Sequence, residues 1–176
     1  MDLLNSKLYP LILNNLPLFI FTILVVERLK QLSKKNIISA WIVYFLSTFF
    51  HELSHYIVSL FTNGKPTKVS LLPSRSEDKK SIILGYVESS NITWYNGFLV
   101  GMSPLSLLVG VYFIDIYFFK FFEESIVSFF VYLFLIIIFI DSSLPSSQDF
   151  KVAFSSIFGV LFYMSLISFL LGVYFV

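Results

Sequence analysis

The chain contains no cysteine and has little charge. Only 13% of its 176 residues are charged, about half the fraction found in soluble domains. The lack of cysteine excludes disulfides and thiolate metal sites. A formal net charge of +1 gives no electrostatic reason to expect a nucleic acid as a partner. Histidine is scarce as well, with two residues in the whole chain.

Apolar residues make up most of the sequence. They account for 57% of the chain, which includes 22 phenylalanines. This composition predicts an integral, multi-pass membrane protein in contact with the lipid bilayer, and we expect it in the cell membrane of a prokaryote. The length is too short for a membrane bundle plus a separate soluble domain, so we expect a single domain over residues 1–176.

Five stretches approach the roughly 20 apolar residues that a helix needs to cross a bilayer. They run from about Leu8 to Val26, Ile37 to Thr62, Trp94 to Phe118, Ser125 to Ile140 and Phe150 to Val176. The predicted fold is therefore an all-α polytopic membrane protein with about five transmembrane helices.

A polar region, residues 63–91, separates the second and third stretches. It opens with the turn-forming run Asn63-Gly64-Lys65-Pro66, which should end the preceding helix. The runs Thr67–Leu72 and Ser81–Glu88 are rich in β-prone residues, and a charged connector lies between them. This pattern predicts a small β-hairpin between the second and third spans.

Both histidines lie in the second stretch, as His51-Glu52-Leu53-Ser54-His55. On a helix, residues four apart share a face, so the two imidazoles can bind one metal ion. The carboxylate of Glu52 can then act as general base toward a water held by that ion. Ionisable groups inside a membrane segment are costly and are functional candidates by default.

Two histidines do not complete a zinc site, which usually has three protein ligands. The third must be a carboxylate, or an amide or carbonyl oxygen. With alternating spans, Asp141 and Asp149 fall on the same side as the histidines, whereas Asp115, Glu123 and Glu124 fall near the opposite face. We favour Asp149, which opens the last helix after a proline-containing entry, and Asp141 is the alternative. Asp149 also fits a second role, as an acid that stabilises a helix N-terminus.

These features together resemble the site-2 proteases, the intramembrane zinc metalloproteases. The resemblance covers roughly Ile37 to Phe158. It rests on the His51–His55 motif within a span, the hairpin after it, and the segments Gly101-Met-Ser-Pro104 and Leu144-Pro145-Ser-Ser-Gln-Asp149. It assigns a metal-binding helix to residues 37–62, a hairpin region to 63–91, a middle core helix to 94–118, and an aspartate-bearing loop and last helix to 141–176.

The resemblance implies a zinc endopeptidase that holds one Zn²⁺ per chain through His51, His55 and Asp149. Its expected substrate is a transmembrane segment of another protein, which the hairpin would present as an extended strand. On this basis the expected substrate-binding residues are Gly85, Tyr86, Val87, Gly101 and Pro104. Two other functions stay open: a catalytically inactive relative that binds metal or protein, and a small membrane transporter. The oligomeric state is open too.

Overall fold

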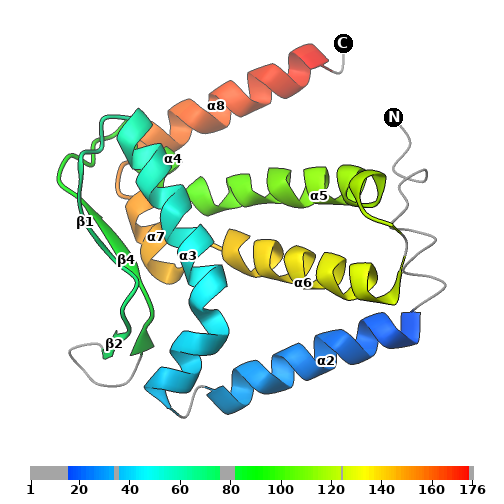
Figure 1. The fold of residues 1–176 in the computed structure, drawn as a ribbon. Coiled ribbons are helices and arrows are strands. Elements are labelled where there is room, and N and C mark those ends of the chain that lie inside the picture. Colours follow the sequence, from blue (N-terminus) through cyan, green and yellow to red (C-terminus); the bar gives the residue numbers. More distant parts are fainter. Residues whose placement is uncertain (1–15, 34–35, 76–81, 124, 175–176) are drawn as a thin grey trace. The chain divides into compact units, whose positions relative to one another are not determined.

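The computed structural model describes residues 16–33, 36–75, 82–123 and 125–174 and is mainly helical (Figure 1). The elements, in chain order, are α2 (Leu16–Ser33), α3 (Ile37–Phe61), β1 (Pro66–Ser70), β2 (Ser74–Arg75), β3 (Ile82–Ile83), β4 (Tyr86–Ser89), α4 (Gly97–Gly101), the 3-10 helix η2 (Ser103–Ser106), α5 (Leu107–Phe121), α6 (Ile126–Ser143), α7 (Ser147–Ala153) and α8 (Ile157–Tyr174).

Three helical segments in the described part of the chain are long and apolar enough to cross a membrane. They are Ile37–Phe61, Ser103–Phe121 and Ile126–Ser143, and a fourth is added if the bent pair α7 and α8 counts as one span. The prediction of about five spans is therefore confirmed only in its coarser form. Part of the predicted first span, residues 8–15, lies outside the described residues, and α2 carries Glu27, Arg28 and Lys30 at its end.

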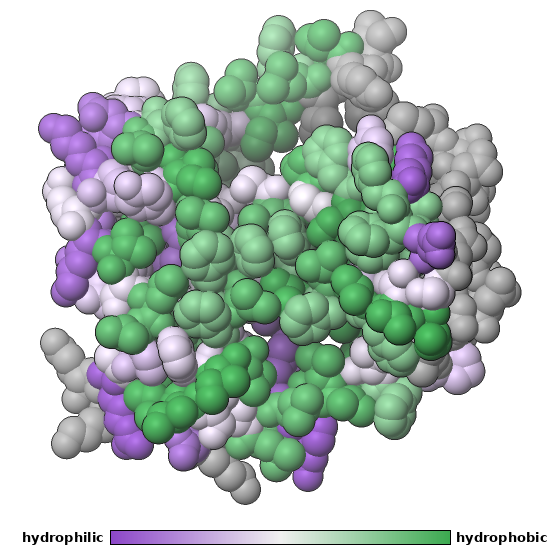
Figure 2. Space-filling model, in the orientation of Figure 1, coloured by the Kyte–Doolittle hydropathy of each residue, from purple (hydrophilic) through white to green (hydrophobic). Residues whose placement is uncertain are grey.

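Large apolar side chains remain exposed along these helices. Apolar residues cover most of the face drawn in Figure 2. Phe21 of α2, Phe121 of α5 and Phe158 of α8 are 63%, 80% and 74% exposed. Exposed apolar surface on this scale is unusual for a soluble monomer and marks a surface that contacts lipid or another apolar partner.

The chain forms two compact units. Unit 1 comprises Met1–Phe50, Leu71–Gly85 and Leu107–Ser142, and unit 2 comprises His51–Ser70, Tyr86–Ser106 and Ser143–Val176. Helix α3 thus contributes its first half to unit 1 and its second half, with both histidines, to unit 2. The expectation of a single domain over the whole chain stays a prediction.

In unit 1, α5 and α6 share an apolar core. Its buried side chains are those of Phe118, Phe119, Phe129, Tyr132, Leu133 and Ile136. Tyr132 is 1% exposed, and its hydroxyl donates a hydrogen bond of 3.1 Å to Asp115. Because a buried phenol needs a polar partner, this bond accounts for an acid in the middle of α5.

An ion pair joins α2 to α6 within the same unit. The Lys30 ammonium lies 2.8 Å from the Asp141 carboxylate and 3.3 Å from that of Glu27, and its side chain is 13% exposed. Burial lowers the pKa of Lys30, but the hydrogen bond and negative charge of Asp141 outweigh that effect. The pKa of Lys30 therefore lies above the usual 10.5.

In unit 2, α3 ends where the sequence predicts a turn. Asn63 has a positive φ of 58°, its N–H donates to the Leu60 carbonyl, and the Gly64 N–H donates to the Ser59 carbonyl at 2.7 Å. This is a Schellman motif, which satisfies carbonyls left open at the helix end. Gly64 is required there because a Cβ atom would overlap the side chain of Ser59.

The predicted hairpin is confirmed as an antiparallel pair of β1 and β4 in unit 2 (Figure 1). Lys68 pairs with Glu88, and the register shifts between Pro66 and Lys68. The second predicted strand is broken, because Leu84 and Gly85 separate β3 from β4. The short strands β2 and β3 pair with each other in unit 1.

The predicted last helix is instead two helices. Helix α7 ends at Ala153, α8 begins at Ile157, and their axes differ in direction by 88° (Figure 1). Glycines allow close packing on both sides of this bend. A Cβ atom on Gly101 of α4 would lie 2.5 Å from the Asp149 carbonyl oxygen, and one on Gly159 of α8 would overlap the Trp94 carbonyl. Helix α7 can therefore pack directly on the backbone of α4.

Candidate metal centre

Helix α3 places both imidazoles on one face, as their four-residue spacing predicts. The ring centroids of His51 and His55 lie 4.8 Å apart, and their Nε2 atoms are 3.2 Å apart. His55 is buried, with 7% of its surface exposed, and the His51 side chain is 16% exposed. The two ring nitrogens therefore converge on one point at the edge of unit 2's interior.

Asp149 reaches the same point from α7. It is the third residue of that helix and forms a capping box with Ser146: the Asp149 N–H donates to the Ser146 hydroxyl, and the Ser146 N–H donates to Asp149 Oδ2 at 2.5 Å. This reciprocal pair satisfies two donors at the helix start and fixes the carboxylate. Oδ2 therefore serves both the cap and the side facing His51, whereas Oδ1 faces His55.

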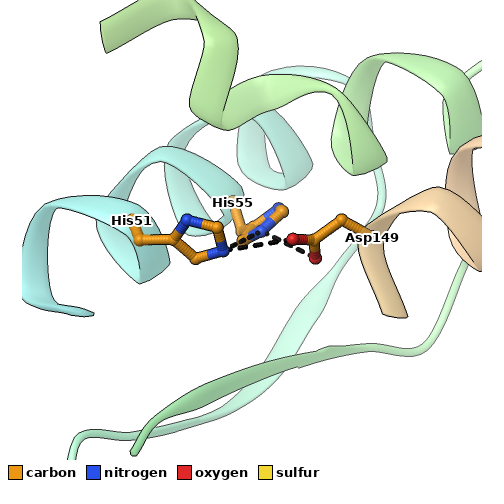
Figure 3. A group of neighbouring side chains, drawn as sticks. All are labelled: His51, His55 and Asp149. Atoms are coloured by element: carbon orange, nitrogen blue, oxygen red, sulfur yellow. Dashed lines mark hydrogen bonds and ion pairs between the residues drawn. The ribbon is translucent and has the colours of Figure 1, made fainter. Parts of the chain in front are cut away.

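The three side chains converge as a triangle in which Asp149 presents both carboxylate oxygens to the imidazoles (Figure 3). Asp149 Oδ2 lies 3.2 Å from His51 Nε2, and Oδ1 lies 3.0 Å from His55 Nε2. With zinc–ligand bonds of 2.0–2.1 Å, two ligands of a tetrahedral site lie about 3.3 Å apart. His51, His55 and Asp149 are also the group of residues, within the described chain, whose ligand atoms lie close enough together to hold a metal ion.

The hydrogen bonds of His55 favour a cation at this point. Its Nδ1 lies 2.8 Å from the Val100 carbonyl oxygen, which can only accept, so the proton of the neutral ring is on Nδ1. The lone pair on Nε2 then faces a carboxylate oxygen of Asp149 at 3.0 Å. Two lone pairs at that distance repel unless a positive charge lies between them. A proton could bridge only one pair of these nitrogen and oxygen atoms, whereas a metal ion could bind the lone pairs of all three side chains.

Glu52 lies next to this triangle in sequence and is buried, with 8% of its surface exposed. Its carboxylate is close enough to interact electrostatically with His51, His55 and Asp149. Glu52 is thus a buried acid close to the two histidines in sequence, and its role as a general base stays a prediction.

The predicted substrate-binding residues occupy different places. Gly101 ends α4 and contacts the backbone of Asp149 and Ala153, so in this structure it faces the helix that bears the third candidate ligand. Pro104 is fully buried in η2. Tyr86 and Val87 lie in β4 of unit 2, and Gly85 belongs to unit 1. Their binding of a substrate stays a prediction.

The other acids considered from the sequence have different surroundings. Asp141 forms an ion pair with Lys30, and Asp115 accepts the hydrogen bond from Tyr132. Glu123 is an exposed residue between α5 and α6, and Glu124 lies outside the described residues. Of the two aspartates favoured by the sequence, Asp149 is the one that joins the histidines.

Three residues around the site were not expected from the sequence. They are Val100 and Ser103, which contact His55, and Ser146, which caps α7. Ser146 could have been found, because Ser146-Ser-Gln-Asp149 has the Ser-x-x-acid spacing of a capping box. Val100 acts through its backbone carbonyl, which leaves no signal in a sequence.

No family model, curated protein or solved structure matches this chain. The resemblance to the site-2 proteases therefore rests on the motif residues and stays a prediction.

Proposed function

We propose that this chain is an intramembrane zinc endopeptidase that hydrolyses peptide bonds in or near transmembrane segments of other proteins. The observation that carries the proposal is the triangle of His51, His55 and Asp149, whose edges of 3.0–3.2 Å suit one tetrahedral ion. Two neutral imidazoles and a carboxylate are a frequent ligand set for catalytic zinc. Because the sequence has two histidines and no cysteine, we propose one such site, and so one Zn²⁺, per chain.

The surroundings of the triangle support hydrolysis within a membrane. Helix α3 is long and apolar enough to cross a membrane, and both histidines lie within it. The buried acid Glu52 next to His51 is the feature that separates a hydrolase from a simple metal binder or transporter, since neither of these needs a base at that position.

Each side chain has a defined task in the proposed reaction. His51, His55 and Asp149 would hold zinc, which supplies Lewis acidity and makes water a competent nucleophile near neutral pH. Glu52 takes a proton from the attacking water as the new C–O bond forms at the peptide carbonyl. It then delivers that proton to the leaving amine as the C–N bond breaks.

The substrate must present an extended segment, because the peptide bonds of a helix are shielded by their own hydrogen bonds and side chains. The sheet of β1 and β4 has two strands, so a third strand can add at an outer edge of this sheet. Tyr86 and Val87 of β4 are the residues of the predicted substrate-binding set that lie in this sheet.

Metal analysis and a cleavage assay test the proposal together. Protein purified in detergent is expected to contain about one zinc per chain, lost in His51→Ala and in His55→Ala. Glu52→Gln is expected to keep its zinc and to lose cleavage of single-span reporter proteins tagged at both ends. Glu123→Gln, the same change at an exposed acid, is the matched control and should keep both properties.

Each alternative gives a different result. Wild-type protein that binds no metal contradicts the proposal outright. Zinc binding with no cleavage of any reporter supports a catalytically inactive relative instead. Cleavage that survives Glu52→Gln shows that another group acts as the base.

A further inference from the structure

The Nδ1 side of the His55 ring contacts one short stretch of chain, from Val100 at the end of α4 to Ser103 at the start of η2. His55 Nδ1 lies 2.8 Å from the Val100 carbonyl oxygen and 3.0 Å from Ser103 Oγ. Ser103 is 5% exposed, so its hydroxyl is shielded from water. A buried hydroxyl at this distance is a partner of the ring rather than an incidental neighbour.

The hydroxyl of Ser103 also lies near the hydroxyl of a second buried serine, Ser54. Ser103 Oγ lies 3.4 Å from the Oγ of Ser54, which is 6% exposed. Ser54 donates its own proton to the His51 carbonyl at 2.7 Å, so its oxygen is free to accept. Ser103 can therefore donate to Ser54 and accept from His55, which gives every buried donor in the series an acceptor.

The hydrogen bonds of this series have one consistent donor-to-acceptor direction, from His55 through Ser103 and Ser54 to the His51 carbonyl. It requires that His55 carry its proton on Nδ1, because the Val100 carbonyl cannot donate. With the proton on Nε2 instead, the Nδ1 lone pair would face a carbonyl oxygen at 2.8 Å with nothing between them. The contacts behind the ring thus fix both its rotation and its tautomer, and they leave the Nε2 lone pair directed at His51 and Asp149.

We propose that Ser103 is a positioning residue for the metal centre: the Val100 carbonyl sets the tautomer of His55, and Ser103 holds the ring in the orientation that presents Nε2 to the ion. The inference rests on the metal-binding part of the proposed function and does not depend on peptide hydrolysis. It gives the Gly101–Pro104 segment a role in building the centre. A partner on the second ring nitrogen orients a metal-bound histidine, and its loss typically weakens metal binding about 10- to 100-fold.

Ser106 provides a matched control in the same turn. Its hydroxyl donates to the Ser103 carbonyl at 2.7 Å, so it stabilises the local backbone. Serine-to-alanine changes at positions 103 and 106 remove the same group from neighbouring sites of η2. The two variants separate an effect on the ring from an effect on the turn.

The test is Co²⁺ and Zn²⁺ affinity in detergent-purified protein, followed by the Co²⁺ absorption spectrum and by competition. Ser103→Ala is expected to weaken binding about tenfold, the lower end of the usual range, because the Val100 carbonyl remains. Ser106→Ala should stay within about twofold of wild type, and Ser103→Thr, which keeps the hydroxyl, should restore most of the affinity. Thermal unfolding shows whether each variant is folded, and Ser103→Thr keeps the test decisive if Ser103→Ala is not.

The outcomes separate this inference from the proposed function. If wild-type protein binds no Co²⁺ or Zn²⁺, the proposed function fails and this inference fails with it. If wild type binds metal but Ser103→Ala binds it equally well, or Ser106→Ala weakens it as much, only the role of Ser103 is overturned. If Ser103→Ala alone weakens binding while no reporter is cleaved, the role of Ser103 stands and the protease proposal fails.

Discussion

His51 Nε2 and Asp149 Oδ2 lie 3.2 Å apart although 98 residues separate them in the chain. One belongs to α3 and the other to the first turn of α7. The sequence offered two roles for Asp149, a helix-start acid and a metal ligand, and the structure shows that one side chain has the geometry for both. Its Oδ2 completes the capping box with Ser146, which leaves Oδ1 directed toward His55.

The first prediction concerns the third ligand. Asp149→Asn should weaken zinc binding by more than about 100-fold, because loss of a direct ligand exceeds the effect of losing an outer partner. Asp141→Asn, the same change at the rival aspartate, should leave zinc affinity within about threefold. Zinc content and competition titrations measure both. Retained affinity in Asp149→Asn, with loss in Asp141→Asn, would reverse the assignment.

The second prediction concerns the packing of α7. A Cβ atom on Gly101 would lie 2.5 Å from the Asp149 carbonyl oxygen and 2.6 Å from the Ala153 backbone nitrogen, and backbone atoms cannot move aside as a flexible side chain can. Gly101→Ala should therefore cost about 1–3 kcal/mol and weaken zinc binding about tenfold. Gly172→Ala is the control, since a Cβ atom there meets nothing within 4 Å. Equal zinc affinity in the two variants would show that α7 can shift without moving Asp149.

The third prediction concerns the helix cap. Ser146→Ala removes the hydroxyl that accepts from the Asp149 N–H at 3.2 Å, and should lower stability by about 1 kcal/mol. The Ser146 N–H remains to hold Oδ2, so zinc binding should weaken less than in Asp149→Asn. Thermal unfolding and zinc titration of the same preparations give both values. Ser147→Ala, one residue further along, should change neither; a loss there equal to that of Ser146→Ala would count against the cap.

The fourth prediction concerns the ion pair in unit 1. Lys30→Met leaves the part-buried Asp141 carboxylate without Lys30, and Asp141→Asn leaves Lys30 with Glu27 as its remaining ion-pair partner. Each change alone should cost about 1–3 kcal/mol. The double variant should be more stable than the sum of the two single losses implies. A double-mutant cycle of thermal unfolding in detergent measures this coupling. Additive losses would mean that the pair contributes nothing.

The pH dependence of the same pair has a defined sign. The pKa of Lys30 is raised above 10.5 in the folded chain, so its contribution is fully present below that value. The contribution is lost as the pH rises through the raised pKa. As the pH rises from neutral, wild type should therefore keep its stability advantage over Lys30→Met until the strongly alkaline range. An advantage that disappears already near neutral pH would contradict this.

Much of the local structure could be predicted from the sequence. The bounds of α3 and the turn at Asn63 and Gly64 follow from hydropathy and turn chemistry. The four-residue spacing of His51 and His55 follows from helix geometry alone. The antiparallel pairing of β1 with β4 follows from two β-prone runs on either side of a polar connector. These features depend on residues that are near one another in the chain.

Other features depended on packing between distant segments. The 88° bend between α7 and α8 was not predicted. The residues between the two helices, Phe154-Ser155-Ser156, contain no proline or glycine that would indicate a break. The division of the second predicted strand at Leu84 and Gly85 was also not expected. The bend and the break in the strand both depend on which segments pack against each other, and this cannot be predicted from the hydropathy of the sequence.

The sequence by itself determined that His51 and His55 share one face of an apolar helix that also carries Glu52, because the helical repeat places residues four apart on the same face. Tertiary structure decided which acid joins them. Asp149 reaches His51 and His55 because Gly101 lets α7 pack against α4 and Ser146 fixes the carboxylate. Tertiary structure also placed Val100 and Ser103 behind the ring of His55. The physical reason is that metal ligation and ring orientation need atoms placed to within a few tenths of an ångström, and only close packing between elements far apart in sequence sets distances that finely.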